Sequence, residues 1–272
     1  MTLSRVFGIV VAAMALALPA ASLAAGKAPR VMSLDSCADQ YVLALAPREA
    51  IVGLSHRAGA ADSYMRAASV GLPRRRATVE SLVAARPDVV VRHWGGDARL
   101  VAALDRRGMR TVRIDDAADF EAVRANVRRV ASALDRKTAG EALIARMDQQ
   151  LNASAGAWKG DSALYLTPGG YTAGSGTLID TMLKAAGLSN AAKGPFFSAV
   201  PLEAMAMTPP RAVVLGFFDQ TRSGSDRWGP GRHAALKRVT RERTIASLPG
   251  AVVGCPAWFA AEGSLMLARA AR

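Results

Sequence analysis

The sequence has 272 residues, 51% of them hydrophobic, and a formal net charge of +13. A chain of this size and apolar content can bury a sizeable core in one or two domains. Apart from Arg74–Arg76, the basic residues are spread along the chain rather than gathered on an aromatic-bearing helix, so the charge does not predict a nucleic-acid-binding protein.

The N-terminus has the pattern of a secretory signal peptide. Arg5 precedes an apolar run over 6–18, and the small residues Ser22 and Ala24 occupy positions −3 and −1 of a cleavage site. The run is short for a membrane span, and no cysteine stands at the cut to carry a lipid. We therefore expect residues 1–24 to be removed and the mature chain to be exported as a soluble protein.

Strands and helices alternate through the first part of the mature chain. Apolar runs predict strands over 30–34, 50–55, 88–93 and 110–115. Helical spacing predicts helices over 37–47, 79–86 and 97–109, and a loop with a short helix over 61–77. This alternation predicts a mostly parallel sheet with helices on both faces.

The middle of the chain is helical. Between 119 and 158 there is no strand signal, and two apolar stripes have helical spacing. The first stripe consists of Val123, Val127, Val130 and Leu134, and the second of Leu143, Ile144, Met147 and Leu151. The sequence at 134–138 separates the two predicted helices.

The alternation resumes after Gly160. Strands are predicted over 162–167, 212–217 and 250–255, and helices over 176–187, 202–207, 233–239 and 261–271. One sequence motif, called the repeated phrase below, occurs as TVESLVAARPDVVV and as PLEAMAMTPPRAVVL. When Glu80 is aligned with Glu203, Pro87 aligns with Pro210, and two consecutive valines of each copy align as well. The repeat indicates the same helix–Pro–strand unit in two similar α/β lobes, which the helical middle joins.

Large rings and polar side chains follow the predicted strands. Ligands of open parallel sheets bind beyond the carboxyl ends of the strands. The candidate ligand-binding residues are Arg57, Tyr64, His93 and Trp94 in the first lobe, and Tyr171, Trp228, Trp258 and Phe259 in the second. Together they indicate a cleft for a bulky, ring-rich ligand. Taken singly, a Trp here can serve packing and a His can be a hydrogen-bonded loop residue.

Motifs of enzymes are missing. The sequence has no G-x-S-x-G, H-E-x-x-H or phosphate-loop pattern, so we expect no enzymatic activity, no cofactor and no metal held by the protein alone. Two alternatives stay open. Cys37 opens a predicted helix and could serve an exported thiol enzyme, and the His and Cys residues could serve a soluble metal chaperone. Whether Cys37 pairs with Cys255 is also open.

Several stretches resemble one family. RVMSLDSCADQYVLALAPREAIVGLS, LDRRGMRTVRID, the two copies of the repeated phrase and the closing PAWF are similar to periplasmic solute-binding proteins of ABC importers for ferric siderophores, haem and cobalamin. RHWGGDARLVAAL most resembles cobalamin-binding members. The resemblance implies a periplasmic, monomeric protein whose N-terminal lobe (25–136) and C-terminal lobe (159–272) are joined by one long helix over 137–158.

The resemblance also implies the ligand and the partner. A siderophore, haem or cobalamin is held between the lobes. Because Trp94 and Trp258 both follow predicted strands that should end at the mouth of the cleft, we expect them to face each other across it. Glu80 and Glu203 match the positions at which one carboxylate per lobe docks onto a permease dimer in the inner membrane. Five arginines near the expected cleft would suit an anionic siderophore or the carboxylates of haem: Arg57, Arg74, Arg92, Arg222 and Arg227.

Overall fold

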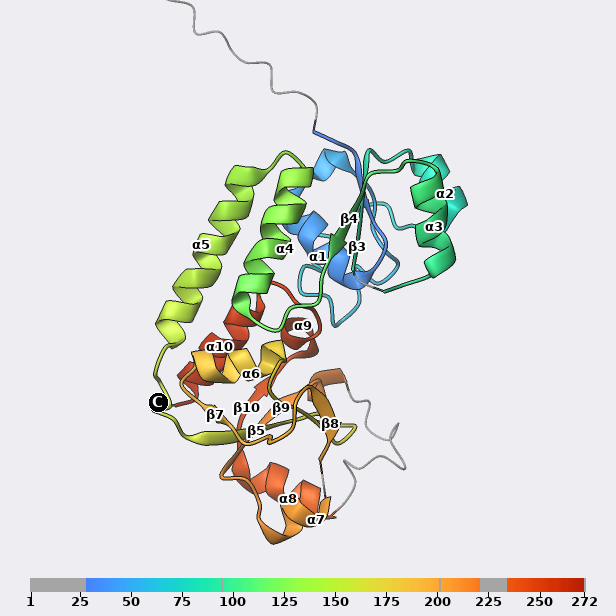
Figure 1. The fold of residues 1–272 in the computed structure, drawn as a ribbon. Helices are drawn as coiled ribbons and strands as arrows, with labels where there is room; N and C mark the ends of the chain where they lie inside the picture. Colours follow the sequence, from blue (N-terminus) through green and yellow to red (C-terminus); the bar gives the residue numbers. More distant parts are fainter. Residues whose placement is uncertain (1–27, 94, 201, 221–233, 272) are drawn as a thin grey trace, which may run out of the picture.

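The computed structural model describes residues 28–93, 95–200, 202–220 and 234–271. The expected signal peptide, Trp94 and Trp228 therefore lie outside the described residues. The chain forms two α/β lobes, and helix α5 connects them along one side of the molecule (Figure 1).

The N-terminal lobe contains a parallel four-stranded sheet in the order β2-β1-β3-β4. Its elements are β1 (Val31–Ser33), α1 (Ser36–Leu45), η1 (Arg48–Ala50), β2 (Ile51–Gly53), α2 (Val79–Ala85), β3 (Val89–His93), α3 (Ala98–Arg106) and β4 (Thr111–Ile114). The segment between β2 and α2 forms turns, and the short helix expected over 61–77 is absent. The carboxyl ends of β1 and β3 face the C-terminal lobe (Figure 1).

The repeated phrase folds as expected in this lobe. Thr78 caps α2 by accepting a hydrogen bond from the backbone N–H of Ser81, and Arg86 ends the helix in the left-handed region at φ 46°. Pro87 then prevents the helix from continuing, and the buried valines of β3 follow. Glu80 lies on the exposed face of the helix, opposite the fully buried Leu82.

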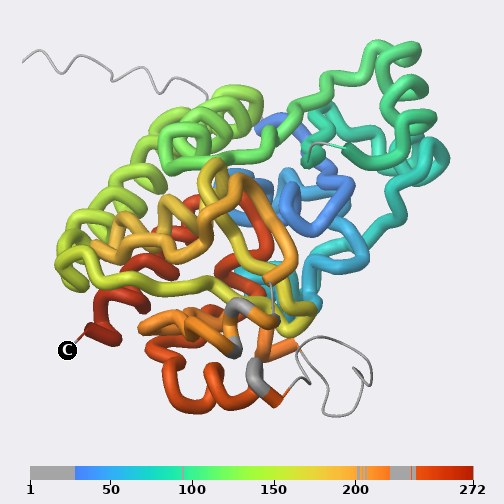
Figure 2. The backbone as a smooth tube through the Cα atoms, turned by 60° about the horizontal axis from the view of Figure 1, so that its bottom comes forward, coloured from blue at the N-terminus to red at the C-terminus, as the bar shows by residue number. Residues whose placement is uncertain are grey.

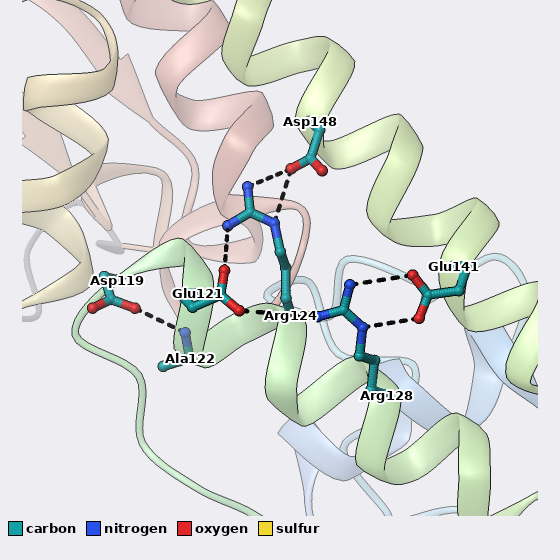
Figure 3. A network of polar contacts seen from close by, with 7 residues as sticks. All are labelled: Asp119, Glu121, Ala122, Arg124, Arg128, Glu141 and Asp148. Atoms are coloured by element: carbon teal, nitrogen blue, oxygen red, sulfur yellow. Dashed lines mark hydrogen bonds and ion pairs between the residues drawn. The ribbon is translucent and has the colours of Figure 1, made fainter.

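Two helices form the middle of the chain, α4 (Phe120–Ala133) and α5 (Lys137–Ser154). The chain reverses at Asp135, which has a φ of 56°. Ion pairs hold the helices together: Arg124 contacts Asp148 at 2.5 Å, and Arg128 contacts Glu141 at 2.9 Å (Figure 3). Since these pairs are partly or fully exposed, each contributes little alone. Together with the apolar stripes they hold α5 against the N-terminal lobe.

The C-terminal lobe contains a parallel sheet in the order β10-β9-β5-β7 and an antiparallel ribbon of β6 and β8. Its elements are β5 (Ser162–Leu166), β6 (Tyr171–Ala173), α6 (Leu178–Ala185), β7 (Ser189–Asn190), β8 (Phe197–Ala199), α7 (Leu202–Met207), β9 (Ala212–Gly216), η2 (Phe218–Gln220), α8 (Ala234–Arg243), β10 (Thr244–Leu248), α9 (Gly250–Val253) and α10 (Ala260–Arg269). Figure 2 shows this lobe from below, with α6 beside α5.

The last strand does not lie where the sequence pattern placed it. Residues 250–253 of the predicted strand form helix α9, and the strand is β10, six residues earlier. Pro249 precedes the first turn of α9, and the N–H of Gly250 donates to the Asp219 carboxylate at 2.9 Å. A short apolar run fits a buried helix turn as well as a strand, and the helix forms here.

One apolar core passes through both lobes. Its buried residues include Val31, Tyr41 and Val89 of the N-terminal lobe and Tyr165, Trp258 and Phe259 of the C-terminal lobe. The Tyr41 hydroxyl donates to the carbonyl of Pro256 at 2.5 Å. The lobes are therefore joined by packing as well as by α5.

Candidate functional site

A cavity of about 520 Å³ lies between the lobes. The N-terminal lobe contributes His93 and the residues that follow β4. The C-terminal lobe contributes the start of α6, the ribbon and the segment after α9. The lining residues are His93, Asp116, Ala117, Ala118, Gly176, Thr177, Leu178, Ile179, Met182, Phe196, Phe197, Val252, Val253, Gly254, Cys255, Pro256 and Ala260. This volume is within the range of small-molecule sites, and the lining is mainly apolar.

His93 forms part of the N-terminal wall. It is the last residue of β3, and its backbone N–H donates to the Asp35 carboxylate at 2.7 Å. Burial is the main cause that lowers the pKa of the imidazole, against the opposing effect of Asp35 and Asp116. A neutral imidazole can accept a hydrogen bond or ligate a metal ion carried by a ligand.

The β6–β8 ribbon presents two phenylalanines to the cavity. The side chains of Phe196 and Phe197 are 66% and 61% exposed, although large apolar side chains are usually covered. Phe196 has a φ of 56°, and its backbone is fixed on both sides: its N–H donates to Ser175 and its carbonyl accepts from Gly174, each at 2.8 Å. The rings are thus displayed by a fixed backbone.

A smaller cavity of about 230 Å³ adjoins the first one at His93. It lies within the N-terminal lobe, between the start of α1 and the start of α3. Its lining includes Asp35, Cys37, Arg92 and Gly95. The Arg92 guanidinium donates to the carbonyl oxygens of His93 and Gly95, each at 3.1 Å, so it is engaged in shaping this loop.

The predicted aromatic residues occupy different surroundings. Tyr171 is exposed on β6, in the same ribbon as the phenylalanines. Trp258 and Phe259 are only 7% and 1% exposed and do not line the cavity. Trp258 packs edge-on against Tyr41 with ring centroids 5.4 Å apart. It therefore lies in the core, whereas the sequence predicted that it would face Trp94 across the cleft. A ligand could stack on Trp258 only if the indole left this packing.

Tyr64 forms a contact between the lobes. Its ring stacks on Phe259 with centroids 4.3 Å apart, and its hydroxyl donates to Glu262 at 2.6 Å. Burial and the adjacent carboxylate raise the pKa of Tyr64 to about 12. The predicted ligand-binding residue Tyr64 therefore joins the two lobes.

The arginines within the described residues are paired elsewhere. Arg57 forms an ion pair with Asp62, and Arg74 donates to Ser69 at 3.2 Å. Neither lines the cavity. Arg222 and Arg227 lie outside the described residues. Among the residues that the structure describes, no arginine or lysine lines the large cavity.

The two glutamates of the repeated phrase are exposed, one on each lobe. Glu80 is in the first turn of α2 and Glu203 in the first turn of α7. The pKa of Glu80 is lowered by hydrogen bonds to its own backbone N–H and to Thr78, so it is ionised at neutral pH. In Figure 1 the two helices lie far apart, on opposite lobes.

Phe196 and Phe197 were not among the residues predicted from the sequence. The rule about strand ends applies to parallel sheets, and these residues belong to an antiparallel ribbon that it does not cover. The local signal was the Gly-Pro-Phe-Phe stretch at 194–197, in which adjacent rings follow two turn-forming residues.

One of the two alternative functions, the exported thiol enzyme, needs a free thiol. Both cysteines of the sequence form one disulfide, Cys37–Cys255, so neither supplies a thiolate. Over the described ranges, no three His, Cys, Asp or Glu side chains are grouped as they would be around a metal ion. None of the helices described has the length and apolar composition needed to cross a bilayer.

Two α/β lobes with a ligand-sized cavity between them define a class of solute-binding proteins. A family model described as "periplasmic binding protein" matches residues 31–249, and the chain belongs to this family. Members of this family bind solutes as components of ABC importers and are not enzymes. No curated protein sequence matches the chain.

Solved structures with this fold include binders of haem and of vitamin B12. The periplasmic haem-binding protein BhuT, solved with two haems, is 26% identical, with 90% of this chain and 99% of that chain covered and a TM-score of 0.67. The haem-binding protein RhuT of Roseiflexus sp. RS-1 is 22% identical, with 90% and 99% covered and a TM-score of 0.69. The vitamin B12-binding protein BtuF of Vibrio cholerae is 16% identical, with 90% and 98% covered and a TM-score of 0.64.

Proposed function

We propose that this protein captures a metal-bearing tetrapyrrole, haem or a corrinoid, between its lobes and delivers it to an ABC importer. The observation that carries the proposal is the interlobe cavity, which combines a mainly apolar lining, the exposed ring pair Phe196–Phe197 and the imidazole of His93. A flat ring system can stack on aromatic side chains. The 26% identity to BhuT, which was solved with haem, supports the same ligand class.

The charge of the lining favours a tetrapyrrole over an anionic ferric siderophore. Recognition of a polyanionic chelate relies on arginine or lysine side chains that pair with its oxygens. The described lining contains neither, and Asp116 adds a carboxylate. The apolar face of a tetrapyrrole ring needs no such cations, and only the carboxylates at the edge of haem would pair with them. A ferric siderophore is therefore the less favoured ligand.

His93 is the side chain best suited to contact the metal of the ligand. Haem iron is commonly held by a histidine. Burial lowers the pKa of His93, which favours the neutral imidazole, the form that ligates metal ions. The metal belongs to the transported ligand, so this role is compatible with the lack of a protein-only metal cluster among the described residues.

Delivery rests on the two exposed glutamates. We propose that Glu80 and Glu203 pair with basic residues of the two permease subunits, one per lobe, as the resemblance implies. Each carboxylate has an exposed apolar neighbour one helical turn along, Val83 (56% exposed) and Met207 (85% exposed). An apolar contact beside each ion pair would exclude water from it and strengthen it. The signal peptide expected over 1–24 would bring the monomeric protein to the periplasm.

A thermal-shift panel tests the ligand class. The purified mature chain is heated with haem, cobinamide, cobalamin, a ferric catecholate and a ferric hydroxamate, each over a range of concentrations. A ligand at a hundredfold excess over its Kd stabilises the folded state by about 2.7 kcal/mol. We expect such stabilisation with a tetrapyrrole and none with the siderophores. Stabilisation by a siderophore alone would overturn the proposed ligand class.

A further inference from the structure

The only disulfide of the chain connects the two lobes. Cys37 is the second residue of α1, directly after the first strand of the N-terminal lobe. Cys255 follows α9 in the C-terminal lobe, 218 residues later, and the two Cα atoms are 5.5 Å apart. In Figure 1 the red segment around α9 lies next to the blue helix α1. A covalent bond therefore joins the two lobes in addition to α5 and the shared core.

The bond lies beside the ligand cavity. Cys255 and its neighbours Gly254 and Pro256 line the interlobe cavity, and Cys37 lines the smaller cavity that adjoins it at His93. The disulfide thus belongs to the wall between the two cavities. A shift of one lobe relative to the other at this point would change the distance between the two sides of the site.

Hydrogen bonds extend the constraint to His93. The Asp35 carboxylate accepts from the backbone N–H groups of Cys37 and Ala38, at 3.1 and 2.9 Å. Its other oxygen accepts from the N–H of His93 at 2.7 Å. One side chain therefore joins the start of α1, which carries the disulfide, to the end of β3. The position of His93 is linked in this way to that of the segment at 254–256.

The other links between the lobes are non-covalent. They include the shared apolar core with the Tyr41–Trp258 ring contact, the hydrogen bond from Tyr41 to Pro256, the Tyr64 contacts with Phe259 and Glu262, and a hydrogen bond from Thr181 to the carbonyl of Ala118 at 2.9 Å. All of these can break and reform as the lobes move. The disulfide cannot, so it limits the opening of the cleft on its side.

We propose that the Cys37–Cys255 disulfide is an interlobe lock that positions the two walls of the ligand site and limits how far the cleft opens. Its effect on the ligand rests on the proposed function, whereas its effect on the lobes does not. A lock that holds the lobes near their ligand-bearing arrangement raises the fraction of molecules competent to bind. It also slows the escape of a bound ligand.

The lock can be released by a dithiol. One thiolate of the dithiol attacks a sulfur of the bond and forms a mixed disulfide, which the second thiol then resolves. Two electrons pass to the protein, which is left with two thiols, and the dithiol becomes a disulfide. Dithiothreitol is the reductant used below. Cys37 is nearly buried, so release should be slow.

The distance between the lobes tests the lock without any ligand. Azide-bearing amino acids at the exposed positions Arg99 in α3 and Arg241 in α8 allow two dyes to be attached without using cysteine. Single-molecule energy transfer is recorded for the oxidised parent, the parent reduced with dithiothreitol, and the Cys37→Ala/Cys255→Ala variant. We expect the distance distribution to broaden in the second and third samples. Tyr64→Phe, which removes one non-covalent link, serves as the control and should broaden it less.

Two results would overturn the lock. One is a distribution of equal width in all three samples while circular dichroism shows the fold retained. The other is a double variant that still responds to dithiothreitol, because the response then has another origin. If the variant fails to fold, reduction of the folded parent decides the question by itself.

Ligand affinity completes the test. With haem as the probe, the Kd from absorbance titration should be about tenfold higher after reduction, if the competent fraction falls to about a tenth. An unchanged Kd together with a broadened distance distribution would overturn the proposal that the disulfide positions the walls of the ligand site. If haem does not bind the oxidised parent, the proposed ligand is wrong, and the distance measurement still judges the lock.

Discussion

The ring of Tyr64 in the N-terminal lobe stacks on the ring of Phe259 in the C-terminal lobe, with an interplanar angle of 16°. The Tyr64 hydroxyl also donates to Glu262. Removing only the hydroxyl with Tyr64→Phe keeps the stacking and leaves the carboxylate without this donor. A hydrogen bond to a charged group contributes about 1.5–3 kcal/mol to stability. Because the Tyr64 side chain is only partly buried, we expect Tyr64→Phe to lower the free energy of unfolding by an amount near the lower end of this range.

Urea unfolding of the parent and Tyr64→Phe measures this loss. Tyr171→Phe is the matched control, because Tyr171 is exposed and has no such partner in the described part of the chain; its change should stay within about 0.5 kcal/mol. Equal midpoints for the parent and Tyr64→Phe would show that the contact between the lobes does not contribute to stability.

The imidazole of His93 predicts how ligand affinity depends on pH. Because burial lowers its pKa below the ordinary value of 6.5, the neutral form persists as the pH falls to that value. We expect haem affinity, measured by absorbance titration, to stay constant from pH 8 to 6.5 and to decrease only at lower pH. The free energy of unfolding changes with pH in the same direction. The contribution of His93 to stability is present above pH 6.5 and is lost as the pH falls through the lowered pKa.

His93→Gln is the control for this profile, since glutamine retains hydrogen-bonding groups without titrating. Its haem affinity should be weaker than that of the parent and independent of pH. A parent whose affinity increases on acidification would contradict a neutral imidazole at the metal.

The ring pair on the ribbon should supply a large part of ligand affinity. Losing one stacked aromatic side chain costs about 1–3 kcal/mol by analogy with base stacking. We therefore expect Phe196→Ala and Phe197→Ala each to weaken haem binding roughly five- to 150-fold by this estimate. Val70→Ala removes an exposed apolar side chain away from the cavity and should leave the Kd unchanged. If the phenylalanine variants bind like the parent, these rings do not contact the ligand.

Two glycines near the ribbon offer a matched pair. A Cβ at Gly174 would overlap the carbonyl oxygen of Gly194, whereas a Cβ at Gly194 would meet nothing within 4 Å. Gly174→Ala should displace the ribbon with its phenylalanines and weaken ligand binding, while Gly194→Ala should bind like the parent. Calorimetric titration of both variants with the ligand provides the comparison. Similar affinities for both would indicate that the position of the ribbon has no effect on binding.

Docking on the permease should fail without the two carboxylates. Glu80→Ala with Glu203→Ala removes one anchor per lobe, and truncating a desolvated ion pair costs about 2–5 kcal/mol. We expect ligand uptake by cells to fall at least about tenfold, with an unchanged Kd in solution. Glu49→Ala with Glu242→Ala, also one exposed glutamate per lobe, is the control and should transport normally. Normal uptake by the Glu80→Ala/Glu203→Ala variant would show that the two glutamates do not dock on the permease and that the repeated phrase is only a shared folding unit.

The apolar neighbours of these glutamates should matter to a smaller degree. Val83→Ser with Met207→Ser keeps both charges and removes the apolar contact, so uptake should fall less than in the double glutamate variant. Ligand affinity in solution should again be unchanged. Uptake equal to that of the parent would limit docking to the ion pairs alone.

Local patterns predicted most of the fold because they are set by local chemistry. The Pro-terminated helix at 79–85 and the valine strand that follows it need only their own residues. The misplaced final strand shows the limit: the apolar run at 250–255 fits two structures, and Pro249 together with the Asp219 contact selects the helix. That contact joins residues 31 positions apart and leaves no trace in the local pattern.

The candidate site was only partly predictable. His93 was found because it ends a parallel strand, where the general rule applies. The burial of Trp258 depends on Tyr41, more than 200 residues earlier, so the sequence could not distinguish a ligand platform from a core residue. The same separation explains why the pairing of Cys37 with Cys255 stayed open until the structure brought the two together.

If the protein binds a tetrapyrrole, the ligand should occupy the cavity between the lobes. A crystal structure of the oxidised protein grown with haem is the decisive test. We expect the electron density of the ring to lie in this cavity, between His93 on one side and the Phe196–Phe197 pair on the other. Density for haem only on the outer surface of one lobe, with the cavity unchanged, would contradict it.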